Sequence, residues 1–196
     1  MLKRLLDILF SLVGLLVLSP ILILISILIF IKDGSPIFFM QERIGKDSNP
    51  FQLFKFRTMR PNSESEGQLS IGGRDPRVTD IGHILRKSKV DELPQLLNVL
   101  KGDMSLVGPR PEVPRYVALY NERQREVLKV RPGLTDKASL AYFNESELME
   151  DKEDPESFYI EELMPAKLEL NLEYLNGRTL ITDIRLIIKT ISRIFD

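Results

Sequence analysis

Two adjacent carboxylates, Asp91 and Glu92, stand where the sequence predicts the start of a helix over residues 92–101. If Asp91 is the N-cap, Pro94 falls in the first turn, where a missing backbone N–H costs little. Both negative charges would then suit the positive end of the helix dipole. A purely structural role, as cap and first-turn residue, is therefore one complete explanation for the pair.

The basic residues around the pair favour a different explanation, in which it handles phosphate. A helix N-terminus attracts phosphate, and Mg²⁺ prefers one or two carboxylates together with substrate phosphate oxygens. Asp91 and Glu92 could therefore bind Mg²⁺ together with an anionic substrate. Each nearby basic side chain could instead be a solvated surface charge, although Arg110 is held between two prolines. The candidate phosphate-binding residues are Lys55, Arg57, Arg86, Arg110 and Arg131.

The first 32 residues differ from the rest of the chain. Between Leu5 and Ile31 the only charged residue is Asp7. A straight helix over this run would be about 40 Å long, which exceeds the roughly 30 Å of a hydrocarbon core. The run is too long for the apolar region of a signal peptide, and no small-residue cleavage site follows it. We therefore expect a membrane segment that the mature protein retains.

Ser19 and Pro20 interrupt this membrane segment near its centre. Pro20 lacks an N–H and its ring crowds the carbonyl of Leu16, so the helix should kink there. The hydroxyl of Ser19 is placed to satisfy a freed carbonyl. A kinked single pass and a helix that bends and returns to the same face both explain this pattern. Basic residues flank both ends, and the positive-inside rule is then satisfied only by the re-entrant arrangement.

Residues 33–196 fit one cytoplasmic domain with a core of its own. The net charge of −1, from 27 basic and 28 acidic residues, gives no indication of a nucleic-acid partner. The absence of cysteine excludes a disulfide scaffold and thiolate metal sites. The single histidine excludes a multi-histidine metal site.

Apolar patterning predicts an α+β fold that is mainly helical. Two strands, 36–45 and 51–59, should form a short hairpin through a turn at 46–50. The glycine- and serine-rich stretch 60–77 is expected to be a mobile surface loop. The acidic stretch 144–157 is expected to be an exposed connection.

Helices complete the predicted domain, and Gly102 should end one of them. The last helix carries isoleucines at helical spacing, with basic residues on its other faces. It either packs on the core as an ordinary helix or lies in the membrane interface with its basic residues toward lipid phosphates. The expected helices span 79–88, 92–101, 112–128, 158–175 and 179–195.

Seven strings in this chain together resemble the bacterial sugar transferases. They are similar to the small monotopic phosphoglycosyl transferases, which begin glycan assembly on a polyprenyl carrier. The resemblance covers nearly the whole chain, and its long central string is highly specific. The strings are "KRLLD", the membrane "SP", "SPIFFMQERIG", "FKFRTM", "VDELPQLLNVLKGDMSLVGPRP", "RPGLT" and "DIRLIIKTI".

The resemblance implies a reaction and a topology. A UDP-sugar and polyprenyl (undecaprenyl) phosphate would give polyprenyl-diphosphate-sugar and UMP, with Mg²⁺ required. The residue matching Asp91 is the nucleophile of the family, and the residue matching Glu92 completes a catalytic dyad. The membrane segment would be re-entrant, with its break at Ser19 and Pro20 and both ends on the cytoplasmic face of the bacterial inner membrane. The arginines matching Arg57, Arg86 and Arg110 belong to the active-site region.

The chain departs from the family pattern after "RPGLT". Many members continue with a glycine, a glutamine-bearing stretch and "NGRN", whereas this chain has "DKASLAYFNE" over 136–145. Substrate contacts carried over from that region, including that of Arg131, are therefore in question. A membrane-anchored scaffold protein and a Mg²⁺-dependent phosphohydrolase remain as alternative functions. The sequence is compatible with a homodimer and does not select among UDP-sugars.

Overall fold

The structure is a computed structural model that describes residues 2–63, 67, 69–72 and 75–195. Helices make up most of this part of the chain, and short strands provide the rest of its regular structure. The predicted mainly helical fold is therefore confirmed. Positions 64–66, 68 and 73–74 fall in the predicted mobile loop, so that prediction lies partly outside the described residues.

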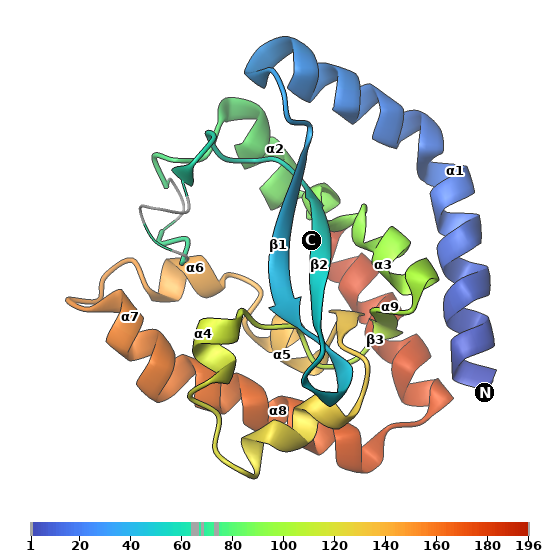
Figure 1. Cartoon of the computed structure of the whole chain (residues 1–196), viewed down its shortest axis with the longest axis vertical. Coiled ribbons are helices and arrows are strands. Elements are labelled where there is room, and N and C mark those ends of the chain that lie inside the picture. Colours follow the sequence, from blue (N-terminus) through green and yellow to red (C-terminus); the bar gives the residue numbers. More distant parts are fainter. Residues whose placement is uncertain (1, 64–66, 68, 73–74, 196) are drawn as a thin grey trace.

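The N-terminal helix α1 (Leu2–Asp33) is continuous but bends near its middle (Figure 1). Pro20 lies inside it, and the hydroxyl of Ser19 donates to the carbonyl oxygen of Leu16 at 2.8 Å. This carbonyl is the one that lacks its usual N–H partner because residue 20 is proline. The predicted kink and its compensating hydroxyl are therefore confirmed. By length and composition, α1 could cross a membrane.

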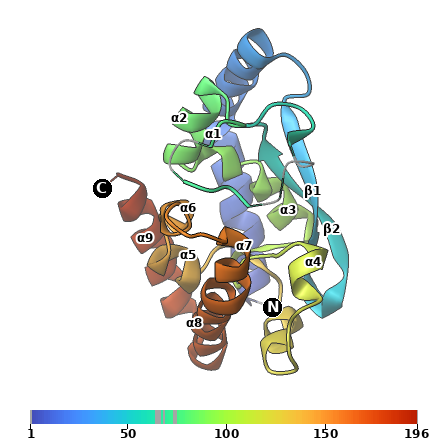
Figure 2. The same cartoon turned by 90° about the vertical axis from the view of Figure 1, so that its left-hand side faces the viewer.

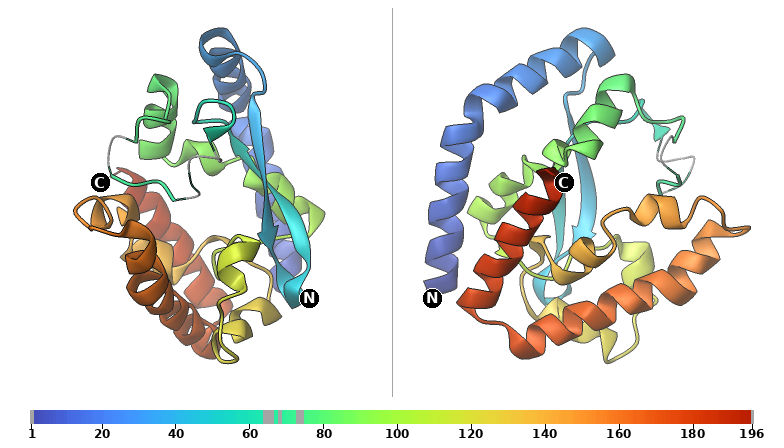
Figure 3. Two further views of the ribbon diagram at one scale, coloured as in Figure 1. Left: turned by 60° about the vertical axis from the view of Figure 1, so that its left-hand side comes forward. Right: turned by 180° about the vertical axis from the view of Figure 1, so that it is seen from behind.

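Both limbs of α1 lie against the rest of the chain (Figures 1 and 3). The N-terminal limb packs closely on α3, since a Cβ at Gly14 would stand 3.4 Å from Leu96. The C-terminal limb buries Ile25 and Ile29 in a small apolar cluster with residues of the hairpin and of α2. The helix is thus attached to the body on both sides of its bend.

The predicted hairpin is formed by β1 (Phe38–Ile44) and β2 (Pro50–Phe56), which pair antiparallel. Its turn contains the 3₁₀ helix η1 (Lys46–Ser48). Leu53 and Phe56 of β2 are both buried, and because they are three residues apart they lie on opposite faces of the hairpin. Leu53 packs with Val99 and Met104, whereas Phe56 packs with Ile25 and Ile29 of α1. Position 55 shares the face of Leu53.

Helix α2 (Asp80–Lys87) begins at its cap Thr79, whose hydroxyl accepts from the N–H of Gly82 at 3.0 Å. The chain then forms the 3₁₀ turn η3 (Val90–Glu92) and helix α3 (Gln95–Lys101). The prediction of a helix over 79–88 is confirmed.

The helix predicted over 92–101 is wrong at its start and right at its end. Asp91 lies inside the 3₁₀ turn, and Pro94 takes the N-cap position of α3. The turn closes through short-range bonds such as that from the N–H of Leu93 to the carbonyl of Val90, at 3.2 Å. Gly102 has a φ of 99° and ends α3 as predicted.

Strands β3 (Ser105–Val107) and β4 (Gly133–Thr135) form a parallel pair that the sequence did not predict. Their approach depends on glycine, because a Cβ at Gly133 would stand 2.1 Å from the backbone nitrogen of Gly108. The pair joins the segment after α3 to the stretch that leads into residues 136–145.

Short helices occupy much of the C-terminal half. The helix expected over 112–128 is instead split into α4 (Pro114–Val117) and η4 (Gln124–Lys129). Asn121 causes the break, because its side chain accepts from the N–H of Gln124 at 2.9 Å and starts a new turn. The other helices are α5 (Lys137–Ala141), α6 (Glu145–Leu148), α7 (Pro155–Phe158), the π-helix η5 (Tyr159–Leu163), α8 (Met164–Gly177) and α9 (Leu180–Phe195).

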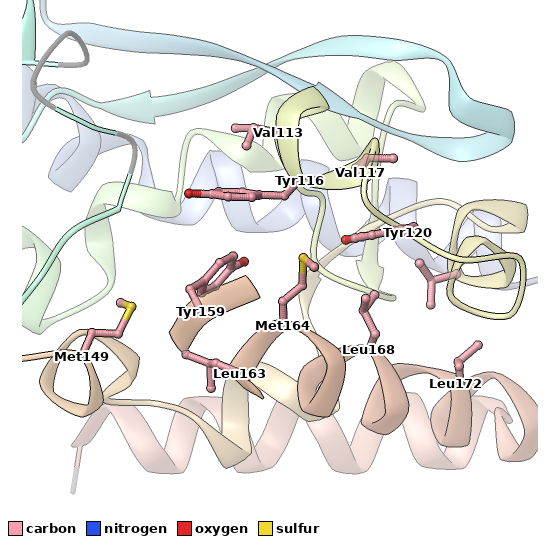
Figure 4. Close-up of a cluster of buried hydrophobic side chains, with 11 residues drawn as sticks. Val113, Tyr116, Val117, Tyr120, Met149, Tyr159, Leu163, Met164, Leu168 and Leu172 are labelled. Atoms are coloured by element: carbon pink, nitrogen blue, oxygen red, sulfur yellow. The ribbon is translucent and has the colours of Figure 1, made fainter. Parts of the chain in front are cut away.

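The largest apolar core lies between α4 and α8 (Figure 4). The rings of Tyr116 and Tyr159 contact each other there, with centroids 4.9 Å apart. Met149 is buried in this core, so the acidic stretch 144–157 is more than an exposed connection. Figure 2 shows α8 and α9 on one side of the molecule and the hairpin on the other.

Candidate active site

The segment between α2 and α3 carries the predicted carboxylate pair. It leaves α2 through Lys89, which has a left-handed backbone conformation, and then closes the turn η3. Asp91 in this turn is 6% exposed. Its Oδ1 is enclosed and has no hydrogen-bond partner in the described part of the chain. Because buried carboxylate oxygens are normally paired, this atom is available for a ligand or for chemistry.

Glu92 is in the opposite situation, since two cations hold its carboxylate. Lys55 donates from Nζ to Oε1 at 2.8 Å. Arg110 donates from Nη2 to Oε1 at 2.5 Å, and its Nη1 lies 3.3 Å from Oε2. Glu92 therefore ties the hairpin to the proline-flanked arginine and fixes two of the predicted basic residues beside Asp91.

The two neighbouring carboxyl groups differ in pKa as a result. Burial raises the pKa of Asp91, and the negative charge of Glu92 adds to this, although Lys55 opposes it. Burial would also raise the pKa of Glu92, but the charges of Arg110 and Lys55 outweigh it and hold that pKa well below its usual range. The ionised form of Glu92 is thus strongly favoured, whereas the ionised form of Asp91 is disfavoured by its surroundings.

Arg86 is the second arginine that the structure brings to the pair. Its Nε donates to the hydroxyl of Thr58 at 2.9 Å, and its Nη1 donates to the hydroxyl of Ser70 at 2.8 Å. Burial lowers the pKa of Arg86, and the charge of Asp91 partly restores it. Within the described ranges its hydrogen-bond partners are neutral hydroxyls, so its charge acts on Asp91 without being neutralised by an ion pair there.

Arg57 lies at the junction of α1 and the hairpin rather than on the carboxylate pair. Its Nη2 donates to the carbonyls of Asp33 and Gly34 at 2.6 and 2.9 Å, which caps the C-terminal end of α1. Its Nε and Nη1 are enclosed and unpaired among the residues described. The side chain therefore fixes α1 to the body, and two of its donors are unused within the described part of the chain.

Arg131 is not brought into this cluster. Its Nε donates to the carbonyl of Gly102 at 2.7 Å, beyond the C-terminal end of α3. The carboxylate pair lies before the N-terminal end of the same helix. The structure thus separates Arg131 from the other predicted phosphate-binding residues.

Lys89 is a residue of the site that the sequence reasoning missed. Burial lowers its pKa, while Glu92 and Asp91 act to raise it, so its side chain shares the environment of the pair. Its Nζ lies 4.8 Å from the ring centroid of Phe143, which belongs to the departing stretch 136–145. The sequence feature that could have identified Lys89 is its position two residues before Asp91.

A magnesium ion fits this site through Asp91. No cluster of three or more potential metal-ligating side chains occurs within the described ranges. Mg²⁺ does not need one, because it can combine one carboxylate with waters and substrate phosphates. The orphaned Oδ1 of Asp91 supplies such a ligand. Glu92, the other predicted ligand, would first have to release Lys55 or Arg110.

The arrangement can support attack on phosphorus. A carboxylate oxygen with a free lone pair is a competent nucleophile for phosphoryl chemistry. The cations around it can bind phosphate oxygens and stabilise charge in the transition state. Because α1 is attached to the body on both sides of its bend, the carboxylate pair lies in a body that packs against an apolar helix.

Comparison with known proteins gives a consistent result. The family model described as bacterial sugar transferase matches residues 1–196. The uncharacterized sugar transferase EpsL of Bacillus subtilis is 47% identical over 71% of this chain and 68% of its own length. The UDP-N-acetylgalactosamine-undecaprenyl-phosphate N-acetylgalactosaminephosphotransferase of Aeromonas hydrophila is 34% identical over 98% of this chain and 43% of its own length.

A third relative is the UDP-glucose:undecaprenyl-phosphate glucose-1-phosphate transferase of Escherichia coli. It is 32% identical over 100% of this chain and 40% of its own length. These two named transferases are therefore much longer than the chain that they match. Since the family model covers the chain from end to end, the protein belongs to the bacterial sugar transferase family.

Proposed function

We propose that this protein transfers a sugar 1-phosphate from a UDP-sugar to undecaprenyl phosphate, giving undecaprenyl-diphosphate-sugar and UMP. The names of the Aeromonas and Escherichia relatives support the reaction class. The observation that carries the proposal is the free Oδ1 of buried Asp91 among cations.

In the first step, a carboxylate oxygen of Asp91 attacks the β-phosphorus of the donor. A bond from Asp91 to phosphorus forms, the bond from that phosphorus to the bridging oxygen breaks, and UMP leaves with the electron pair. Among the described residues the guanidinium of Arg86 is held by hydroxyls, and its charge can stabilise charge on the phosphate oxygens. Lys55 and Arg110 keep Glu92 ionised and fixed beside the nucleophile.

In the second step, a phosphate oxygen of the lipid acceptor attacks the same phosphorus. The bond from phosphorus to Asp91 breaks and its carboxylate is regenerated. A bound Mg²⁺, with Asp91 and substrate phosphates as ligands, would neutralise charge on the diphosphate. Glu92 is adjacent to the nucleophile, and its proposed role is either to bind the metal or to handle the acceptor's proton.

The attachment of α1 supports a re-entrant membrane segment. Near its N-terminus, Arg4 donates to the carbonyls of Val99 and Leu100 at 2.5 and 2.9 Å. At its other end, the carboxylate of Asp33 accepts from the hydroxyl of Thr79 at 2.7 Å. Both ends of α1 therefore contact the body that carries Asp91. We propose that both lie on the cytoplasmic face of the bacterial inner membrane, where the lipid acceptor's phosphate is reachable.

Helix α9 is proposed to contribute to the same interface. Its residues Ile184, Ile188 and Ile191 are all more than half exposed. The exposed isoleucines recur at helical spacing, and they would lie in the acyl boundary while basic residues of α9 meet lipid phosphates.

The test is UMP release by the purified full chain in lipid nanodiscs, with a panel of UDP-sugars and Mg²⁺. Turnover should require added undecaprenyl phosphate and should consume one donor per lipid product. Sustained UMP release without lipid would identify a phosphohydrolase instead. No UMP release with any donor would favour a scaffold and would contradict the proposal.

A further inference from the structure

Lys89 combines a strained backbone with a charged side chain. Its φ of 55° and ψ of 14° lie in the left-handed region. Glycine adopts this region freely, whereas residues with a Cβ disfavour it. A turn that leaves a helix commonly uses glycine or asparagine there. Because the turn itself does not require lysine, the side chain calls for a functional explanation.

The side chain of Lys89 lies near the carboxylates without pairing with them. The backbone carbonyl of Lys89 accepts from the N–H of Glu92 at 3.3 Å, which places the residue at the start of the turn that carries both carboxylates. Its charge acts on those of Glu92, Arg110 and Asp91. Glu92 is already engaged by Lys55 and Arg110. Within the described part of the molecule, Lys89 forms no ion pair with a carboxylate. A cation without a direct counterion beside a reactive site favours an external anion.

Phe143 is the observed partner of the Lys89 ammonium group. Nζ of Lys89 lies 4.8 Å from the ring centroid, and the guanidinium carbon of Arg193 lies 5.3 Å from the same centroid. Phe143 thus joins the active-site turn to α9 through two cation–π contacts. Such a contact is weaker than a charge-assisted hydrogen bond to phosphate. The ring can therefore hold the ammonium group in place and release it to an anion.

We propose that Lys89 binds phosphate oxygens of the UDP-sugar beside Asp91, and that Phe143 is a positioning residue that holds Lys89 for this contact. The inference rests on the proposed function, since it adds a donor contact at the same site. It also gives the departing stretch 136–145 a role in donor binding. Because the lipid acceptor presents phosphate oxygens too, the test separates donor from acceptor.

The first arm of the test uses Lys89→Gly, with Lys89→Arg for rescue. Glycine relieves the left-handed backbone, so the Tm of the full chain should equal or exceed that of the wild type. The Kd for UDP and the KM for the UDP-sugar should nevertheless rise about tenfold, as expected for a lost charge-assisted contact. Arginine should restore most of the affinity. Lys87→Ala is the control, because Lys87 is exposed and its loss removes the same charge two residues away.

Two results would overturn the donor contact. One is an unchanged Kd for UDP in Lys89→Gly. The other is a rise in the KM for undecaprenyl phosphate while the donor KM stays constant, which would assign Lys89 to the acceptor. UDP binding is measured by calorimetry without turnover. Failure of this contact is therefore distinguishable from failure of the proposed transfer reaction.

The second arm tests whether Phe143 acts through Lys89. Phe143→Leu keeps the apolar bulk but removes the ring, and the donor KM should rise about threefold at unchanged kcat. Phe143→Tyr should behave like the wild type. In the Lys89→Gly background, Phe143→Leu should add no further effect. An equal added effect in that background would refute the positioning role.

Discussion

Two clusters of polar side chains lie at opposite ends of α3, and they differ in how their buried groups are paired. Beyond the C-terminal end, Asp7 of α1 accepts from the hydroxyl of Ser105 at 2.9 Å and from the N–H of Leu106 at 3.1 Å. Before the N-terminal end, Asp91 keeps an enclosed oxygen that is unpaired among the described residues. Both carboxylates are almost fully buried.

The difference indicates which carboxylate is structural and which is reactive. Asp7 uses both oxygens to anchor α1 to β3, so its burial is compensated. Asp91 retains an oxygen that is unpaired among the described residues, and burying it lowers the stability of the fold. A buried carboxylate whose bonds are complete can be removed only at the expense of stability. One with a free oxygen should be removable mainly at the expense of function.

The largest effect is expected for Asp91→Asn. The amide cannot form the acyl phosphate, so transfer should fall by about 10³-fold or more. Because the Oδ1 of Asp91 has no hydrogen bond to lose among the described residues, the Tm should stay close to that of the wild type. Turnover and thermal unfolding of the nanodisc-embedded chain measure the two quantities. A folded variant with near-normal turnover would remove Asp91 as the nucleophile.

Glu92→Gln should be the next most severe change. It leaves the charges of Lys55 and Arg110 without their counterion, so both stability and turnover should fall. We expect turnover to drop by about 10- to 100-fold. A raised Mg²⁺ requirement would indicate metal binding, whereas a slower lipid step would indicate proton transfer at the acceptor. Wild-type stability and turnover in Glu92→Gln would show that the ion pairs of Glu92 with Lys55 and Arg110 are not needed.

The same glutamate predicts a pH dependence of stability. Its pKa is lower in the folded chain than in the unfolded chain, so its ion pairs stabilise the fold above the unfolded value of about 4.3. That contribution should be lost as the pH falls through the lower, folded-state pKa. Glu92→Gln should flatten this part of the Tm profile, below about pH 5. An identical acid profile of Tm in the wild type and in Glu92→Gln would show that the ion pairs of Glu92 do not contribute to the stability of the fold.

Asp7→Asn should affect stability and leave chemistry intact. The amide would face two donors with only one acceptor atom, which costs about 1–3 kcal/mol. The Tm should fall, while kcat at a temperature below unfolding should remain within about twofold. Asp151→Asn is the matched control, because Asp151 is exposed. A loss of kcat without a change of Tm would show that Asp7 is a reactive carboxylate and not a structural one.

The smallest expected effect concerns the bend of α1. Replacing Ser19 and Pro20 with Ala and Leu restores a helical N–H and removes the ring clash, which favours a straight spanning helix. Lys3 and Arg4 oppose their own translocation, so a mixed population should result. The chain has no cysteine, so Leu2→Cys can be labelled on intact cells with an impermeant reagent. Strong labelling without the Ala-Leu change would show that α1 crosses the membrane.

Local signals in the sequence predicted much of the fold. Thr79 and Gly102 bound their helices, and Ser19 with Pro20 marks the bend, because caps and prolines act on their own turns. The break at Asn121 also had a local signal, since asparagine followed three residues later by glutamine resembles a capping box. The long apolar periodicity of 112–128 concealed it.

Contacts between distant segments could not be predicted in the same way. The parallel pair of β3 and β4 depends on two glycines that meet only in the folded chain. For the site, the adjacency of Asp91 and Glu92 is visible in the sequence. The difference in pairing and pKa between the two carboxylates depends on Lys55 and Arg110. These lie 37 and 18 residues from Glu92 in the sequence. Arg131 was grouped with Arg110 among the candidate phosphate-binding residues, yet it lies beyond the other end of α3.

The most direct test of Asp91 as a nucleophile is intact-mass analysis of the full chain after incubation with UDP-sugar and Mg²⁺ but no lipid. A covalent mechanism should release UMP up to about one per enzyme and then stop. The protein mass should increase by one phospho-sugar, and Asp91→Asn should show neither change. Transfer that proceeds on lipid addition without any prior burst or adduct would demonstrate direct displacement and contradict the mechanism.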